Sequence, residues 1–267
     1  MNANRFTMIS DRGDPRIAPF VSVRERDLTG GTDGRFIVEG KVPLEILLTR
    51  SRFDVDSLFL CESRLEPLGD LLSQCPPDMP VYVAPQSLMD AIVGFPIHRG
   101  VLACAKKGTC LSLDAFHDAK RLLVLNQISN HDNVGAAFRN AAAFGAEGVI
   151  LDAGSCDPLY RKAIRVSSGA SLWLPYHQGG IGLDQVHTLQ AEGFEVWAMT
   201  PREGAAPLRS LKVPDKLAIL LGAEGPGLPD PLIEACQAVR IPMKPGFDSV
   251  NVATAGAIAL AHTYSAD

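Results

Sequence analysis

The chain has little of what marks secreted, metal-binding or membrane-spanning proteins. Its 267 residues include six cysteines, none in a CxxC pair and none at metal-ligand spacing from a histidine. The sequence therefore indicates neither a zinc site nor a disulfide framework, and we expect reduced, mostly buried thiols. No run reaches the roughly 18 apolar residues of a membrane span, and the polar N-terminus lacks the apolar segment of a secretory signal. We expect a soluble, cytoplasmic protein without a metal site.

Basic residues are also fewer than acidic residues. The chain carries 25 Lys and Arg residues against 30 Asp and Glu residues, which gives a net charge of −5. Because phosphate contacts need Lys and Arg, this balance weighs against non-specific binding of nucleic acid. Any nucleic-acid site must therefore depend on local clusters of basic residues rather than on the total charge.

Three common catalytic signatures are missing as well. After the apolar stretch that ends at Leu125 the chain continues Asn126-Gln-Ile-Ser129, where a nucleotide-binding oxidoreductase or an ordinary Rossmann methyltransferase would have a glycine-rich turn. The sequence has no GxSxG nucleophile elbow and no GK[ST] phosphate loop. These absences argue against the most common α/β enzyme classes.

The order of strands and helices predicts an α/β protein in two parts. We expect residues 1–14 to form a flexible polar tail, residues 15–113 a small α/β domain, and residues 114–267 a second domain in which strands and helices alternate. This alternation predicts a largely parallel sheet that is covered on both faces. Expected strands of the second domain cover 121–125, 148–152, 194–199 and 217–221; expected helices cover 134–144 and 158–168, with a last helix that ends near His262.

Two loops of the second domain have the composition of a ligand site. The run 222–228 holds three glycines around Glu224, and the run 241–252 leads into an alanine-rich helix with Ser249 and Asn251 at its start. Glycine lets a backbone pass close to a ligand, and a helix start offers unsatisfied N–H donors. Both loops follow expected strands, so they predict a crevice at the carboxyl ends of the sheet.

A third run, 126–145, reads as a strand end followed by a helix. Asp132 or Asn133 is the expected N-cap, and Gly145 is expected to end the helix. Helical spacing places Arg139 beside the buried stripe of this helix. An arginine there is costly unless an anion or a carboxylate pairs with it, and a salt bridge is the simplest alternative to a functional role.

Together the three runs resemble the SpoU-type branch of the SPOUT superfamily, whose first motif is N-x-G-x-x-x-R-x-A-x-x-F-G. The first motif is matched by Asn133, Gly135, Arg139, Ala141, Phe144 and Gly145; the second by Gly222, Glu224, Gly225, Gly227 and Leu228; the third by Ile241, Pro242, Met243, Gly246, Ser249, Asn251 and Val252. Order and spacing agree as well, and the resemblance covers about residues 120–267.

The resemblance implies an S-adenosylmethionine-dependent methyltransferase that acts on the ribose 2′-hydroxyl of a tRNA or rRNA nucleotide. It implies a trefoil-knotted catalytic domain and a homodimer whose active site draws on both subunits, although general folding rules make knots very rare. The implied catalytic residues are Arg139, Asn133, Glu224, Ser249 and Asn251, and the implied cofactor-binding residues are Thr200, Gly222, Gly225, Ile241, Met243 and Val250.

The role of Arg139 stays open between two alternatives. By resemblance it either takes the proton of the 2′-hydroxyl or positions the neighbouring phosphate. A guanidinium has a pKa above about 12 and is a poor base. Phosphate binding, with proton loss to a nearby acceptor, is the alternative.

The first domain, residues 15–113, resembles a small α/β RNA-binding domain related to a kink-turn-binding ribosomal protein, mainly through the runs 38–40 and 98–103. We expect it to select the RNA, through the arginines Arg24, Arg26, Arg35, Arg50, Arg52 and Arg64. In the second domain Arg161, Arg165 and Ser168 lie at helical spacing and could line a path for RNA phosphates, but a solvated helix face would look the same.

One departure from the family pattern leaves a second function open. Many members have Asp-Pro before the first-motif asparagine, where this chain has Asn130-His131. The stiffness of that entry loop is therefore in question. The alternative function is an RNA-binding module that keeps the fold but has lost catalysis.

Overall fold

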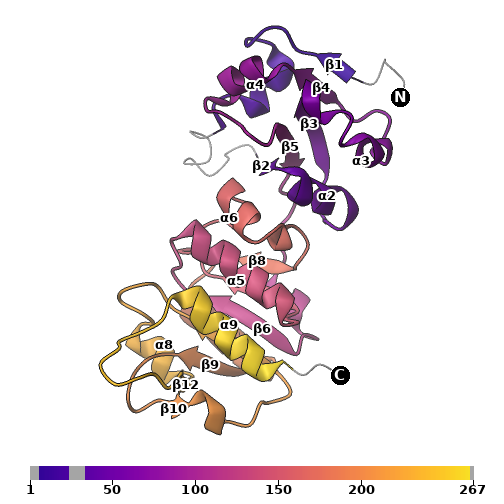
Figure 1. The fold of residues 1–267 in the computed structure, drawn as a ribbon. Helices are drawn as coiled ribbons and strands as arrows, with labels where there is room; N and C mark the ends of the chain where they lie inside the picture. Colours follow the sequence, from indigo (N-terminus) through magenta and orange to yellow (C-terminus); the bar gives the residue numbers. More distant parts are fainter. Residues whose placement is uncertain (1–5, 24–33, 265–267) are drawn as a thin grey trace. The chain divides into compact units, whose positions relative to one another are not determined.

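The structure is a computed structural model that describes residues 6–23 and 34–264 (Figure 1). Its contacts form two compact units. Unit 1 comprises residues 1–109 and 159–173, and unit 2 comprises residues 110–158 and 174–267. The sequence predicted a boundary at 113/114 and assigned 159–173 to the second domain, whereas the contacts group this segment with unit 1. The expected flexible tail over 1–14 is also corrected, because residues 6–8 pair with residues 81–83 in the sheet of unit 1. The division of labour between the domains stays a prediction.

Unit 1 is built on a five-stranded mixed sheet. The strand order is β1-β4-β3-β5-β2, in which β4 pairs in parallel with β1 and β3, while β5 pairs antiparallel with β3 and β2. The strands are β1 (Phe6–Met8), β2 (Arg35–Glu39), β3 (Val55–Cys61), β4 (Val81–Ala84) and β5 (Val101–Lys106).

The described helices of unit 1 are short, and α2 is the longest of them at nine residues. They are η2 (Pro15–Phe20), α2 (Lys41–Thr49), η3 (Glu62–Arg64), α3 (Gly69–Ser73), α4 (Gln86–Val93), α6 (Arg161–Val166) and η5 (Ala170–Leu172). One core cluster joins η2 and α4 to β3, and its rings Phe20 and Phe59 lie 5.4 Å apart between centroids. Such aromatic pairs stabilise a core beyond the area that they bury.

Unit 2 is built on a seven-stranded sheet in which all pairs are parallel. The strand order is β10-β12-β9-β11-β6-β7-β8. The strands are β6 (Arg121–Leu125), β7 (Gly148–Leu151), β8 (Tyr176–Gln178), β9 (Glu195–Met199), β10 (Ala206–Pro207), β11 (Leu217–Leu221) and β12 (Gln237–Arg240). Every residue of β7 and β11 is buried, as expected for strands that are covered on both faces.

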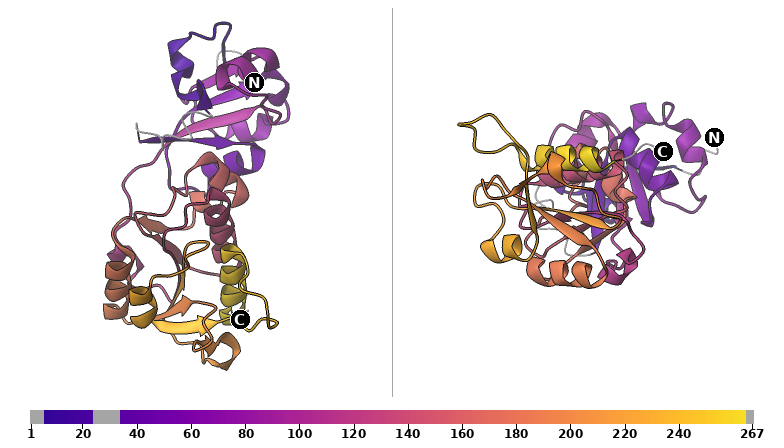
Figure 2. Two further views of the ribbon diagram at one scale, coloured as in Figure 1. Left: turned by 90° about the vertical axis from the view of Figure 1, so that its left-hand side faces the viewer. Right: turned by 90° about the horizontal axis from the view of Figure 1, so that it is seen from below.

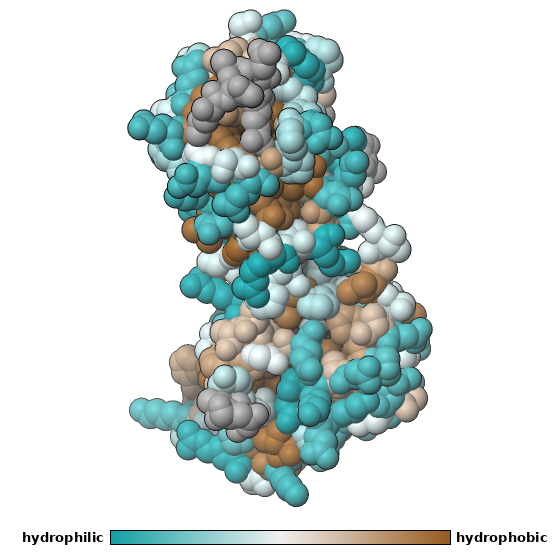
Figure 3. All heavy atoms as spheres, turned by 90° about the vertical axis from the view of Figure 1, so that its right-hand side faces the viewer, coloured by the Kyte–Doolittle hydropathy of each residue, from teal (hydrophilic) through white to brown (hydrophobic). Residues whose placement is uncertain are grey.

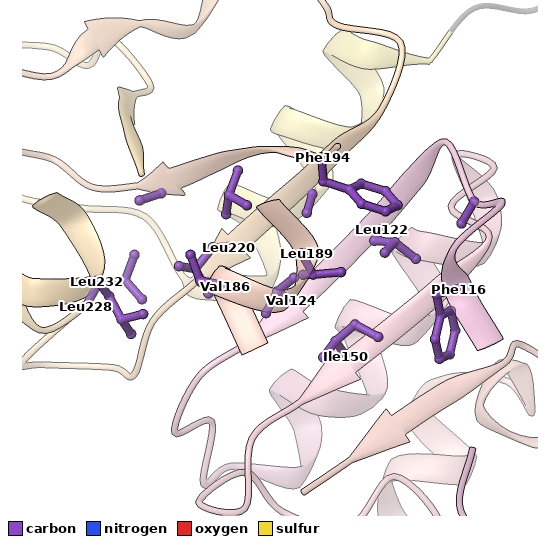
Figure 4. Packing of buried hydrophobic residues seen from close by; sticks show 14 of the residues in the cluster. Phe116, Leu122, Val124, Ile150, Val186, Leu189, Phe194, Leu220, Leu228 and Leu232 are labelled. Carbon is purple, nitrogen blue, oxygen red and sulfur yellow. The ribbon is translucent and has the colours of Figure 1, made fainter. Parts of the chain in front are cut away.

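Helices cover both faces of the unit 2 sheet. They are η4 (Leu113–Phe116), α5 (His131–Ala143), α7 (Gly182–Ala191), η6 (Leu208–Ser210), α8 (Asp230–Glu234) and α9 (Val252–Thr263). Figure 2 shows α5 and α9 on one face and α7 and α8 on the other. The core beneath α7 and α8 joins apolar side chains of β6, β7 and β11 to those of the two helices, and its labelled members point toward one another (Figure 4).

The predicted strands and helices of unit 2 are confirmed to within a few residues, with one correction. The N-cap of α5 is Asn130 and not Asp132 or Asn133, because the Asn130 side chain accepts a hydrogen bond of 2.8 Å from the Asp132 N–H. The prediction for the other end holds, since Gly145 follows the C-cap with φ of +68°. The side-chain oxygen of Asn130 therefore caps the start of this helix.

The described residues include no helix that is long and apolar enough to cross a membrane. Figure 3 shows one face of the molecule, on which hydrophilic side chains surround smaller apolar patches. All six cysteines are free; Cys61, Cys75 and Cys104 are buried, Cys156 and Cys236 are half-buried, and Cys110 is exposed.

Candidate active site

A cavity of about 500 Å³ opens at the carboxyl ends of β9, β11 and β12. Its walls come from three segments: 199–201 after β9, 221–227 after β11, and 241–255 between β12 and the first turn of α9. All six predicted cofactor-binding residues line it, namely Thr200, Gly222, Gly225, Ile241, Met243 and Val250. The cavity has the size and the position of a small-molecule site in a parallel α/β sheet.

The two glycines of the 222–228 loop are needed for different reasons. A Cβ on Gly222 would lie 2.6 Å from the Leu228 nitrogen and 2.7 Å from the Gly227 carbonyl carbon, so the loop's own backbone fills that space. Gly225 has open space around it but a φ of +85°, which an L side chain rarely adopts. The sequence explained both glycines by close approach of a ligand; at Gly222 the closely approaching group is the loop itself.

Asn251 begins α9 and at the same time points into the site. Its Oδ1 accepts hydrogen bonds from the N–H groups of Ala253 at 2.9 Å and Thr254 at 3.2 Å. An amide whose oxygen caps a helix must turn its NH₂ group away from that helix. The Asn251 Nδ2 therefore donates to Asn133 Oδ1 at 2.9 Å and to Glu224 Oε1 at 3.3 Å.

Asn133 completes the network from the buried side of α5. Because its Oδ1 accepts from Asn251, its Nδ2 is free to donate, and it donates to Glu224 Oε1. One carboxylate oxygen thus receives two amide N–H groups, from residues 91 and 27 positions away. Glu224 itself is exposed and lines the cavity. The tertiary structure brings three of the five predicted catalytic residues into one hydrogen-bonded triad.

The other two predicted catalytic residues lie differently. Ser249 lines the cavity and is exposed. Arg139 is exposed on α5, does not line the cavity, and its guanidinium has no hydrogen-bond or ion-pair partner among the residues that the structure describes. The expectation that Arg139 borders the buried stripe is wrong, since that stripe is centred on Val134, Phe138 and Ala141 and leaves Arg139 on the open side of the helix.

The residues proposed for an RNA path belong to unit 1. Arg161 pairs with Glu39, and its guanidinium lies 4.9 Å from the ring centroid of Phe95. Its side chain is only 15% exposed and that of Glu39 only 8%. Arg165 and Ser168 are exposed. The three residues therefore do not form one free surface, because Arg161 is engaged inside unit 1.

Sequence reasoning missed some parts of the site. Asp248 lines the cavity beside Ser249, and Met199, Pro201 and Ala255 add apolar contacts. Asp248 stands inside a run already singled out, so its carboxylate was a usable signal. The apolar residues carried no signal because isolated Met, Pro and Ala residues are common in every segment.

The model of the SpoU rRNA Methylase family matches residues 120–261, which is more than half of the chain. The chain belongs to this family. An uncharacterized tRNA/rRNA methyltransferase of Mycobacterium tuberculosis is 37% identical over 260 residues, covering 94% of this chain and 89% of the relative. The 23S rRNA (guanosine-2′-O-)-methyltransferase RlmB of Shewanella oneidensis is 30% identical over 234 residues, covering 84% of this chain and 94% of RlmB.

Solved structures extend the family likeness to the fold. An AdoMet-bound rRNA methyltransferase from Sinorhizobium meliloti superposes with a TM-score of 0.79 at 20% identity, covering 97% of each chain. At that identity the likeness shows the fold alone. The predicted family and the predicted α/β methyltransferase fold are thus confirmed for this SpoU methylase, whereas the trefoil knot stays a prediction.

Proposed function

We propose that this SpoU methylase transfers a methyl group from S-adenosylmethionine to the ribose 2′-hydroxyl of a tRNA or rRNA nucleotide. The observation that carries the proposal is the Asn133–Glu224–Asn251 triad at the edge of the cavity. It presents a carboxylate fixed by two donors beside a space of small-molecule size. The RlmB relatives methylate a guanosine 2′-oxygen of 23S rRNA, which supports the same reaction class.

The lining of the cavity suits the cofactor. Ile241, Met243 and Val250 offer apolar contacts for an adenine ring, and Thr200 adds a hydroxyl group. When bound, S-adenosylmethionine supplies a methyl group on a positively charged sulfur. The two carboxylates of the lining, Glu224 and Asp248, favour a ligand with positive charge.

Glu224 is the acceptor of the hydroxyl proton in this proposal. A ribose hydroxyl is a weak nucleophile and must lose its proton as it becomes an ether. Oε1 of Glu224 is already held by two N–H donors, so the incoming proton goes to Oε2. Because Glu224 is exposed, it can pass this proton on to water.

Arg139 serves the cavity of a second subunit in this proposal. Its own cavity lacks it, although the first family motif carries it. Asn140, the next residue on α5, donates a hydrogen bond of 2.9 Å to the Ala253 carbonyl oxygen of α9. Helices α5 and α9 therefore form one surface, which would pair with the same surface of a second subunit. Ile258 and Tyr264 leave apolar area exposed on and after α9. From a partner, the Arg139 guanidinium would bind the RNA phosphate next to the target ribose.

Unit 1 selects the RNA in this proposal, with Arg165 and Ser168 as candidate phosphate contacts. The intact triad argues against the alternative of an RNA-binding module without catalysis. Because ribosomal and transfer RNA are the proposed substrates, the proposal includes a cytoplasmic location.

The transfer is tested with RNA extracted from cells that lack the gene. We expect label from the methyl group of S-adenosylmethionine to appear as a 2′-O-methylnucleotide after nuclease digestion. Label on a base, or none at all from protein that binds the cofactor by calorimetry, would refute the proposal. The mapped position would name the RNA.

The proton acceptor is tested by Glu224→Gln, which keeps the shape and removes the acceptor. We expect cofactor and RNA affinities within about threefold, a kcat lower by about 10²-fold or more, and a rate that rises with hydroxide concentration across a pH range where the wild-type rate is flat. Asp248→Asn tests the rival carboxylate of the cavity. A hydroxide-dependent rate in Asp248→Asn but not in Glu224→Gln would assign the proton to Asp248.

The shared site is tested by mixing Arg139→Ala with Glu224→Gln. In a two-fold dimer, random exchange gives half heterodimers, each with one complete site, so about a quarter of wild-type activity should return. If Arg139 serves its own chain, mixtures that have exchanged subunits will recover nothing.

A further inference from the structure

We infer that the turn Lys244–Phe247, at the rim of the cavity, is a binding site for a nucleobase and its phosphate. Phe247 is 68% exposed, a large value for an aromatic side chain. Met243 before the turn and Asp248 after it both line the cavity, whereas the turn residues themselves do not. This inference rests on the proposed function and adds to it the residues that would receive the nucleotide.

The turn has a defined backbone that presents Phe247. The Phe247 N–H donates a hydrogen bond of 3.2 Å to the Lys244 carbonyl oxygen. Pro245 is the second residue of this four-residue turn, and Gly246, the third, has a φ of +88°. Proline followed by a residue with positive φ is the pattern of a type II turn. The backbone of the turn therefore directs the Phe247 ring outward. Because neighbouring Cα atoms lie about 3.8 Å apart, the ring stays next to Asp248, which lines the cavity.

Nothing that the structure describes covers the ring. Phe247 makes no aromatic pair with any of the described residues, and its exposure means that it adds little to the stability of the fold. Lys244 in the same turn is exposed and has no ion-pair partner within the described ranges. The turn thus offers an unused aromatic face and an unused cation three residues apart.

A nucleotide fits both groups. A ribose whose 2′-hydroxyl enters the cavity carries its base and its phosphates to the rim, because all three are attached to one sugar ring. Bases stack on aromatic side chains regardless of their sequence, and lysine binds phosphate as a point charge. A purely apolar partner would not use Lys244, which favours the nucleotide over a second copy of this chain.

The main test compares four variants at position 247 in affinity for RNA extracted from cells that lack the gene. We expect Phe247→Ala and Phe247→Leu each to weaken RNA binding about tenfold, while Phe247→Trp and Phe247→Tyr bind within about twofold of the wild type. Leucine keeps an apolar surface but has no π face. Ile181→Ala is the matched control, since Ile181 is also 68% exposed and lies outside the cavity.

Two further readouts separate the possible occupants. In Phe247→Trp, RNA should quench the added indole fluorescence, and heparin, which is anionic but has no bases, should not. Lys244→Ala should lower the salt-dependence slope of RNA binding by about one. Cofactor affinity by calorimetry and the sedimentation coefficient should match the wild type in every variant.

Three results would overturn the inference: equal RNA affinity in Phe247→Ala and wild type, leucine that restores binding as well as tryptophan, or dissociation of a dimer in Phe247→Ala. The last would assign the turn to a second copy of the chain. A wild-type protein that binds RNA but never methylates it would refute the proposed function, and the affinities at position 247 would still decide this inference.

Discussion

Several arginines of unit 1 have partners, whereas Arg139 of unit 2 has none among the described residues. In unit 1, Arg35 pairs with Asp56, Arg64 donates to the His98 carbonyl, Arg50 lies 4.0 Å above the Trp173 ring and Arg161 pairs with Glu39. In unit 2, Arg139 has no partner among the described residues. The arginines counted in the sequence as RNA contacts of the first domain therefore include several with structural duties, and Arg24 and Arg26 lie outside the described residues.

The difference between these arginines follows from what each side chain helps to hold together. Unit 1 has a small mixed sheet with short helices, and cation–π and ion-pair contacts add to its limited apolar core. Unit 2 has a seven-stranded parallel sheet covered on both faces, so its packing does not need Arg139. An unpaired arginine on a helix that packing already stabilises is available for function.

The largest effect on stability is expected at Arg161. Removal of one partner from a pair as buried as Glu39–Arg161 leaves an uncompensated charge and typically costs about 3–5 kcal/mol. Arg161→Ala should therefore lower the denaturant midpoint of unit 1 while cofactor affinity stays unchanged. Arg165→Ala on the same helix is the control, with an expected change within about 0.5 kcal/mol. Equal unfolding curves for the two variants would contradict a structural role for Arg161.

The opposite pattern is expected at Arg139. Because its side chain is exposed and unpaired, Arg139→Ala should change the free energy of unfolding by less than about 0.5 kcal/mol. Loss of a charge that stabilises the transition state costs about 10²–10³-fold in kcat, so methyl transfer should fall by that factor. A loss of stability without a loss of activity in Arg139→Ala would remove the contrast between Arg139 and Arg161.

A smaller effect is expected at the glycines of the cofactor loop. Gly222→Ala forces a Cβ against the backbone of residues 227 and 228, and such overpacking costs about 1–3 kcal/mol. Gly225→Ala meets open space and pays only for its positive φ, about 1 kcal/mol. Calorimetry with S-adenosylmethionine should show the larger loss of affinity in Gly222→Ala. The reverse order would mean that a bound ligand occupies the open space at Gly225, so that a side chain there costs more cofactor affinity than the backbone clash at Gly222.

The smallest effect is expected from thiol chemistry. Burial raises the pKa of the Cys156 and Cys236 thiols to about 11, so both stay protonated at pH 8 and gain reactivity only as the pH approaches 11. The three described thiols of unit 1 are buried. Mass spectrometry after brief iodoacetamide treatment at pH 8 should find label at the exposed Cys110 before any other cysteine. Early label at a unit 1 thiol would show that this unit opens more readily than unit 2.

Short-range patterns in the sequence predicted most strands and helices of the second domain. Continuous apolar stretches predicted β6 and β11 at their observed bounds, since strands buried on both faces have no polar positions to obscure them. The segment 159–173 was assigned to the wrong neighbours, because helical spacing reports which face of a helix is apolar and not which sheet it packs on.

By itself, the sequence determined the α/β class and the three motif runs, because these depend on short-range patterns and on glycines at fixed positions. The family resemblance of those runs supplied the six predicted cofactor-binding residues that line the cavity. Only the tertiary structure decided which of those residues contact one another. Asn133, Glu224 and Asn251 come from three distant segments, and the direction of both amides follows from the α9 cap. Likewise, only the packed chain shows that Arg161 is engaged and Arg139 is free, because the partner of a charge is set by contacts between distant segments and not by its neighbours in the sequence.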